Sequence, residues 1–422
     1  MAYPTLLLET AFTVGGTGGT TMLLDDAARG LLDTATLSGE VWTDITAYAL
    51  GFSVRRGASR AEGPVLRFEA GSMTVTLDNS DRRFDPTNLT GPYVGAGVSQ
   101  VTPMRAVRVT AAYAGTSHPV FSGYADSWDI SYDEPSMSTC TLTATDATKV
   151  LSNFDRVALG SAVGAGELSG ARVHRVLNSA AWPVGQRQIA AGDSTLQGTT
   201  MDRSAWEELL KVQDSEIGQV FVDARGYVVF RNRLANMADT KSANVQGSFG
   251  DAAGELPFVD HTIAYDDTTL NNLVRVSNVG GTQQIAQDTT SQQTYLVHTF
   301  DRTDLILQTD AAAANYASFV LYQTKEPELR FDALSIAPHD DPDTLFVQVL
   351  ARDFGDRIRL TRRPPGGGAV TTRDSFIVGV QHEVSGPNEW RTTWALQSST
   401  KWAFFTLDNT SLGTLDANAL AY

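Results

Sequence analysis

The feature that most constrains this chain is a strand pattern that runs directly into a dense polar loop. Met73, Val75 and Leu77 alternate with threonines, which is the period of a β-strand with one buried face. Residues 78–81, Asp-Asn-Ser-Asp, follow at once, and such side chains hydrogen-bond their own backbone in turns. The fold therefore has to contain a sheet in which a half-buried strand ends in an ordered turn.

The residues after this turn favour a structural loop over a catalytic one. Two arginines stand beside the acids as ion-pair partners, Phe84 offers an apolar anchor, and Pro86 restricts Asp85 to extended backbone. The stretch contains no candidate nucleophile, no histidine and no metal-ligand spacing. We predict a structural or subunit-interface motif made of nine residues: Asp78, Asn79, Asp81, Arg82, Arg83, Phe84, Asp85, Pro86 and Asn88.

The length of the chain and its net charge limit the number of domains and the kinds of ligand. A chain of 422 residues with 42% hydrophobic and 19% charged residues predicts two to four folded domains. Asp and Glu number 48 against 32 Lys and Arg, a net charge of −16 that repels polyphosphate. Only short basic pairs occur, such as those at residues 82–83 and 362–363. Specific nucleic-acid binding is therefore not expected.

The single cysteine and the lengths of the apolar runs bear on the cellular compartment of the protein and on whether it crosses a membrane. Cys140 is the single cysteine, so we expect no intrachain disulfide and no cysteine-based zinc site, but a small core residue in a strand. The start of the chain lacks the basic region of a signal peptide, and no run approaches the roughly 18 apolar residues of a membrane span. Synthesis and folding in a cytoplasm are expected, without a membrane span.

The glycine-rich run at residues 15–19, Gly-Gly-Thr-Gly-Gly, raises the question of a phosphate loop. Such a loop ends in Gly-Lys-Ser or Gly-Lys-Thr, and a dinucleotide turn opens a helix; neither pattern is present. We therefore expect a flexible loop here and no cofactor.

Strand and helix patterns divide the chain into four predicted domains. Regularly spaced short strands predict an N-terminal β-barrel or sandwich over residues 1–150. Residues 151–245 predict a small α+β domain: a helix capped by Ser204 with Glu207, then a hairpin turning at Gly226. A β-rich domain with one helix is expected over residues 246–340, and a C-terminal β-barrel portion with a polar tail, from Thr406, over residues 341–422.

One run of sequence is specific enough to suggest a family. Residues 77–88, Leu-Asp-Asn-Ser-Asp-Arg-Arg-Phe-Asp-Pro-Thr-Asn, resemble the minor tail proteins of siphophages that infect actinobacteria. More broadly, the chain resembles the baseplate-hub family of tailed phages. Softer similarities lie in residues 122–128, 204–231 and 390–399. The resemblance implies a mainly β fold with small α+β insertions, in which two antiparallel β-barrel-like domains flank smaller domains.

The same resemblance implies a function. A non-enzymatic virion protein of a long non-contractile tail is expected, a homotrimeric tail-tip hub whose pseudo-sixfold ring closes the tail tube below the tape-measure protein. Its partners would be the distal tail protein, the tape-measure protein and other tail-tip or fibre proteins. DNA would pass through the lumen at genome ejection, and an acidic wall would repel it. A hexameric distal tail protein of the same tail tip is the close alternative.

A carbohydrate-binding or glycan-cleaving β protein is the alternative from another class. Glu69 with Asp78, Asp81 or Asp85 has the residue types of a glycosidase pair, which needs two carboxyl groups a few ångströms apart. Turn chemistry accounts for these acids more simply.

Two further groups deserve comparison with known binding sites. Trp390 and Trp394 share one face of a predicted strand, where exposure would favour sugar stacking and burial would indicate core. His339 with Asp340, Asp341 and Asp343 has metal-ligand residue types, yet Pro342 disrupts calcium-loop spacing and no further histidine is near. A solvated acidic turn is favoured there, and ion binding stays open.

Overall fold

The computed structural model describes residues 3–13, 41–59, 63, 65–95, 97–134, 137–155, 159–386 and 389–402. The predicted glycine loop at residues 15–19 and the predicted tail from Thr406 lie outside these ranges.

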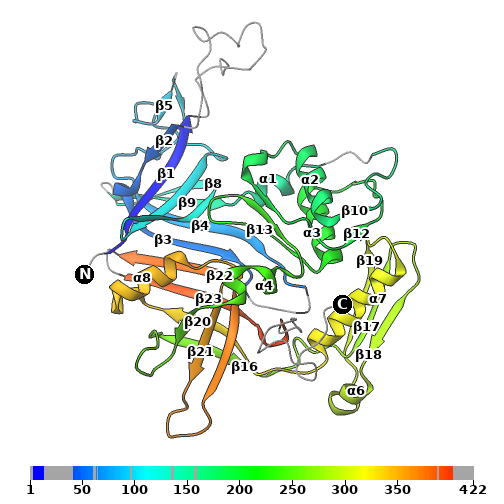
Figure 1. The fold of residues 1–422 in the computed structure, drawn as a ribbon. Helices are drawn as coiled ribbons and strands as arrows, with labels where there is room; N and C mark the ends of the chain where they lie inside the picture. The colour runs from blue at the N-terminus through cyan, green and yellow to red at the C-terminus, as the bar shows by residue number, and fades with distance from the viewer. Residues whose placement is uncertain are drawn as a thin grey trace.

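A large sheet dominates the molecule, and 13 of the described strands belong to it (Figure 1). Its N-terminal half contains β1 (Thr5–Thr13), β2 (Val41–Asp44), β3 (Ala49–Gly57), β4 (Glu69–Asp78), β7 (Ala106–Tyr113), β8 (Thr116–Glu134) and β9 (Met137–Thr145). Its C-terminal half contains β15 (Val245–Phe249), β16 (Asp260–Ala264), β20 (Arg330–Ile336), β21 (Arg357–Arg362), β22 (Thr371–Gly386) and β23 (Glu389–Ser398).

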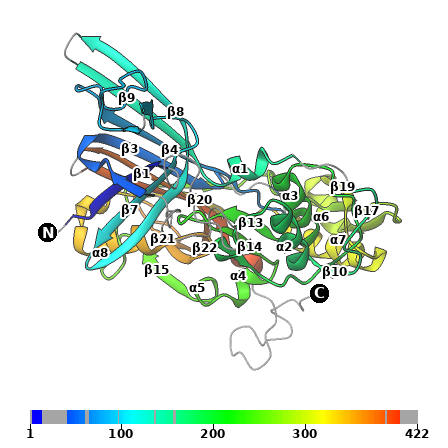
Figure 2. The same ribbon diagram turned by 90° about the horizontal axis from the view of Figure 1, so that it is seen from above.

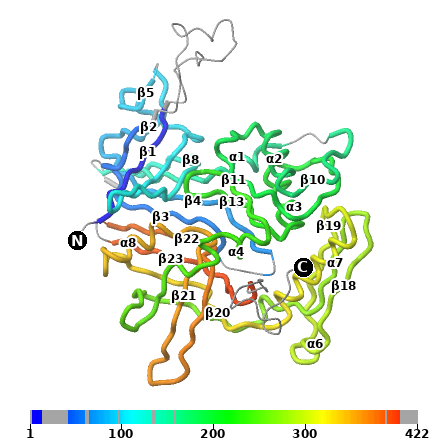
Figure 3. The backbone as a smooth tube through the Cα atoms, in the orientation of Figure 1, coloured from blue at the N-terminus to red at the C-terminus, as the bar shows by residue number. Residues whose placement is uncertain are grey.

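The two halves meet where β3 pairs antiparallel with β22 (Figure 3). Val54 lies opposite His382, and Gly57 lies opposite Gly379. Gly57 has a φ of 89°, and a Cβ atom there would stand 2.4 Å from the carbonyl oxygen of Val378. Only glycine allows this backbone conformation at this separation, so Gly57 lets β3 close against β22.

Alternating side chains of the large sheet form the first core. Met73, Val75 and Leu77 of β4 are at most 1% exposed, which confirms the predicted buried face. The core continues without interruption from these residues to Ile377 and Trp394 in the other half. Small elements border the sheet: η1 (Thr46–Tyr48), the β5–β6 hairpin (Val94–Gly95 and Val98–Ser99), η3 (Pro338–Asp340), α8 (Pro342–Ala351) and η4 (Thr400–Trp402).

A second body with its own core lies beside the sheet (Figures 1 and 2). Its first part contains α1 (Thr148–Ser152), β10 (Glu167–Leu168), α2 (Ser169–Ser179), η2 (Val184–Gln186), β11 (Arg187–Ile189), β12 (Thr195–Leu196), α3 (Ala205–Glu216), β13 (Gln219–Val222), β14 (Val228–Arg231), α4 (Ala235–Ala238) and α5 (Thr240–Ala243). Its second part is a three-stranded sheet with two helices: β17 (Leu273–Asn278), β18 (Gln284–Gln287), α6 (Thr289–Tyr295), β19 (Thr299–Leu305) and α7 (Asp310–Thr324).

The predicted capped helix and hairpin in this body are confirmed. The Ser204 hydroxyl accepts a hydrogen bond from the Glu207 backbone, and the Glu207 side chain accepts one from the Ser204 backbone. The β13–β14 turn places Gly226 at a φ of 84°. Phe221 of this hairpin reaches into the first core, 4.8 Å from the Phe68 ring, and so fastens the second body to the sheet.

The mainly β class with α+β insertions, expected from the sequence, is the observed one. Residues 246–340 contribute to both bodies, because β15, β16 and β20 join the large sheet while β17–β19 and α7 join the second core. The exact domain limits at residues 150, 245 and 340 stay a prediction. None of the described helices has the length and apolarity needed to cross a bilayer.

The junction between the halves predicts a pH dependence of stability. His382 is 3% exposed and accepts a hydrogen bond from Trp390 Nε1 at 3.3 Å. Burial, with the nearby Arg56 charge, lowers the pKa of His382 to about 3. The unfolded chain takes up this proton near pH 6.5 and the folded chain does not, so the free energy of unfolding should fall by up to roughly 1.4 kcal/mol per pH unit below 6.5.

Urea unfolding between pH 7 and 5 measures this slope. A His382→Gln variant, which cannot titrate, should lose less stability over the same interval. Parallel pH profiles of the two proteins would contradict the assignment.

Candidate functional site

Asn79 organises the loop that follows β4. Its side chain is fully buried and bridges two segments. Asn79 Nδ2 donates to Ser138 Oγ of β9 at 3.1 Å, and Asn79 Oδ1 accepts from the Phe84 backbone N–H at 2.8 Å. The backbone N–H of Asn79 also donates to the Ser138 carbonyl at 2.8 Å. One amide therefore fixes the start of the loop to the sheet and sets the direction of its return.

Phe84 anchors the loop in an aromatic cluster. Its side chain is 0% exposed, which confirms the predicted apolar anchor. The Phe84 ring lies 5.8 Å from Tyr48 edge-on, 5.6 Å from Tyr93, and 5.9 Å from Trp128 in a stacked arrangement. Phe12 of β1 stacks on Tyr93 at 4.0 Å and joins the loop to the first strand.

Asp85 collects donors from three directions. Its Oδ1 accepts from Thr87 N–H at 2.8 Å and Thr87 Oγ at 2.6 Å, while its Oδ2 accepts from Arg82 Nη2 at 2.8 Å and Tyr132 Oη at 2.8 Å. Burial raises the pKa of Asp85, but these hydrogen bonds outweigh it and hold that pKa well below its usual range. Arg82 reaches the carboxylate from a left-handed backbone, φ 60°, a conformation that is costly for a residue with a Cβ.

The outer charges of the loop are also paired within the chain. Arg83 Nε donates to Asp81 Oδ2 at 2.9 Å, and the Arg83 guanidinium lies 3.6 Å from the centroid of the Tyr48 ring. Asp78 Oδ1 accepts from the Ser80 N–H at 2.9 Å. Asn88 Nδ2 donates to the Arg82 carbonyl at 2.9 Å. The charged groups thus shape the loop itself, and Pro86 lies on its exposed side.

The carboxylates do not form a glycosidase pair. Glu69 stands at the start of β4, where it accepts from Arg55 Nη2 at 2.8 Å and Ser59 Oγ at 2.7 Å. Asp78 stands at the end of the same strand, about 30 Å away at the rise of an extended chain. This separation greatly exceeds the spacing that either glycosidase mechanism uses. Asp81 and Asp85 lie in the turn that follows Asp78, at the end of β4 opposite to Glu69.

The other two candidate groups are positioned by packing. Trp390 and Trp394 are 5% and 0% exposed, so they belong to the core and offer no open stacking platform. His339 Nδ1 lies 3.1 Å from the Trp390 carbonyl, and Asp341 precedes the first turn of α8. Within the described ranges, no three histidine, cysteine or acidic side chains converge in a way that could hold a metal ion.

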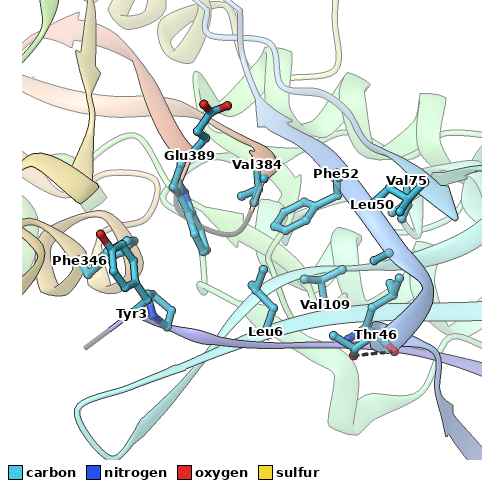
Figure 4. Close-up of a pocket in the computed structure, with 16 residues that line it drawn as sticks. Tyr3, Leu6, Thr46, Leu50, Phe52, Val75, Val109, Phe346, Val384 and Glu389 are labelled. Carbon is cyan, nitrogen blue, oxygen red and sulfur yellow. Dashed lines mark hydrogen bonds between the residues drawn. The ribbon is translucent and has the colours of Figure 1, made fainter. Parts of the chain in front are cut away.

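An apolar cavity of about 350 Å³, which the sequence did not reveal, lies where the two halves of the sheet meet (Figure 4). β1, β3, α8 and the adjoining ends of β22 and β23 supply its walls. Its lining includes Tyr3, Leu6, Leu50, Phe52, Val384 and Trp390. No local pattern predicts such a cavity, because its walls come from strands at the two ends of the sequence.

Comparisons with known proteins give matches in structure and none in sequence. No protein-family model and no curated protein matches the chain. The 43 kDa tail protein of prophage MuSo2 from Shewanella oneidensis is similar in structure, with a TM-score of 0.57 and 13% identity over 94% of this chain and 99% of that chain. The tail protein from Neisseria meningitidis MC58 has a TM-score of 0.56 and 14% identity over 86% and 95% of the two chains. The chain therefore has the fold of these phage tail proteins.

Removal of the Asn79 amide tests its organising role. Asn79→Ala leaves the buried Phe84 N–H without its partner and should lower the free energy of unfolding by about 2–3 kcal/mol. Urea unfolding followed by tryptophan fluorescence measures the change, since Trp128 contacts the Phe84 ring. Asn88→Ala, at a half-buried asparagine of the same loop whose amide makes a solvent-exposed hydrogen bond to the Arg82 carbonyl, is the control and should cost less than about 1 kcal/mol. Equal losses in both variants would contradict the assignment.

Asp85 predicts a second pH dependence. The pKa of Asp85 in the folded chain lies below the unfolded value of about 3.9. Its contribution to the free energy of unfolding is therefore present above pH 4 and is lost as the pH falls through the folded pKa. Asp85→Asn should therefore be less stable than the natural chain by about 1–3 kcal/mol at pH 7, with a difference that shrinks below pH 4. Thermal unfolding at pH 7 and pH 3 measures both values. A difference that grows in acid would exclude a stabilising carboxylate.

Proposed function

We propose that this chain is a non-enzymatic structural protein of a phage virion, the hub of the tip of a long non-contractile tail. In this proposal three copies form a ring that closes the tail tube below the tape-measure protein, against the distal tail protein. Fibre or other tail-tip proteins attach around it, and DNA leaves through its lumen.

The observation that carries the proposal is the extent of the structural likeness. The matched region takes in nearly the whole of both chains, 94% and 99% for the MuSo2 tail protein, so the sheet and the second body are both included. The run at residues 77–88 adds an independent resemblance in sequence to actinobacteriophage minor tail proteins.

The internal chemistry of the loop at residues 78–88 supports a structural role. Its acids are bound to neighbouring arginines, hydroxyls and backbone N–H groups, as an element needs when its function is to hold a shape. We propose that the outer surface of this loop contacts another subunit of the tail. The net charge of −16 supports passage of DNA without adhesion.

Subunit copy number in isolated tail tips tests the proposal directly. Reconstruction of the tail tip by electron microscopy should place three copies of the chain around the tail axis. Six copies in one ring would instead support the distal tail protein, the alternative in the same assembly.

A cell-wall hydrolysis assay separates this proposal from the glycan alternative. The chain should show no turnover, alone or in assembled tail tips. Turnover that disappears in Glu69→Gln or Asp81→Asn variants would overturn the non-enzymatic assignment.

A further inference from the structure

The turn after α6 presents a strained and exposed apolar projection made of Leu296 and Val297, which we call the knuckle. Leu296 has φ 65° and ψ 178°, a region that residues other than glycine rarely adopt. Its side chain is 76% exposed and that of Val297 is 58% exposed. The exposed side chain of Leu296 buries little apolar surface in its own fold, so a strained backbone at this position is consistent with a binding role for that side chain.

A fully buried side chain holds this knuckle in place. Asn272 Nδ2 donates to the Leu296 carbonyl at 2.7 Å, and Asn272 Oδ1 accepts from the His298 N–H at 2.9 Å. Gln292 Nε2 donates in turn to the Asn272 carbonyl at 3.0 Å. Leu296 and Val297 therefore project from a turn that is held by partly buried hydrogen bonds.

The knuckle is also electrically neutral within a strongly acidic chain. Residues 289–300 contain no Asp, Glu, Lys or Arg, although 19% of the chain is charged and the net charge is −16. The apolar cavity is nearly uncharged, because Glu389 is the one charged residue among the described side chains that line it. Two copies of the chain repel each other over most of their surfaces, and these two regions can approach without that cost.

The knuckle and the cavity lie at opposite ends of the molecule. The cavity adjoins Tyr3 at the start of the described chain, and both views place this end away from α6 (Figures 1 and 2). A projection at one end and a cavity at the other produce head-to-tail contacts, which generate rings when the rotation closes.

We propose that Leu296 and Val297 of one copy insert into the apolar cavity of a second copy, in the mouth formed by Leu50 and Phe52. This inference rests on the proposed function, because it supplies the contact that a hub ring requires. Leu50 is 55% exposed and lies at the cavity, so it is a suitable partner surface for an incoming side chain.

Leu296→Gly separates a binding role from a folding role. Glycine relieves the strain at this position, so the melting temperature of the single chain should rise by about 1–4 °C. Removal of the apolar anchor should at the same time weaken self-association by about 10- to 100-fold. Analytical ultracentrifugation over a concentration series measures association, and higher ionic strength should strengthen it by screening the repulsion.

Leu50→Lys tests the other side of the contact. A lysine at the cavity mouth should weaken association by a similar factor and leave the fold intact, because the side chain is exposed. Val184→Lys is the matched control, since Val184 is 73% exposed and lies in η2, apart from both surfaces. It should associate like the natural chain.

Mixing the two variants distinguishes a head-to-tail contact from a symmetric one. The Leu296→Gly copy keeps its cavity and the Leu50→Lys copy keeps its knuckle, so the mixture should form a one-to-one dimer and stop there. Unchanged association of either variant, or no dimer in the mixture, would overturn the inference. Three copies in tail tips built from the Leu296→Gly variant would overturn this contact alone and leave the hub function standing.

Discussion

The pairing of β3 with β22 is the contact on which the rest of the molecule depends. It makes one continuous sheet from strands at the two ends of the sequence, so the cores of both halves become a single core. The pairing needs Gly57, because any side chain there would meet the Val378 carbonyl. It also buries His382 and closes the walls of the apolar cavity. The stability of the sheet, its pH response and the apolar cavity thus share one origin.

The loop after β4 shows how a dense set of charges can be structural. A carboxyl group that serves as a general acid or base needs access to substrate and a pKa near the working pH, whereas Asp85 is buried and its pKa is held low by hydroxyl, backbone and arginine donors. The donors come from two parts of the chain: Thr87 and Arg82 belong to the loop, and Tyr132 belongs to β8. The carboxylate therefore connects the loop to the sheet in the same way that Asn79 does.

The sequence predicts those features that depend on neighbours along the chain. Alternation identified the buried face of β4, the Ser204–Glu207 spacing identified the start of α3, and turn residues located the loop with its Phe84 anchor. Local patterns carry no information on long-range pairing, so the junction of β3 with β22 and the cavity beside it were not foreseen. The bond from Asn79 to Ser138 has the same character, because it depends on the register of β4 against β9.

Leu296 marks a different limit of sequence reasoning. Glycine or asparagine is the usual signal of positive φ, and a leucine gives no such sign. Its conformation depends on Asn272, whose side-chain amide bonds to the Leu296 carbonyl and to the His298 N–H. The side chains of Leu296 and Val297 then point to solvent. In an acidic chain, long-range forces between copies are repulsive, so any specific self-contact has to come from short-range apolar fit. A neutral apolar projection satisfies that requirement better than a charged surface, because apolar burial stabilises the contact only when the partner copy encloses the projection.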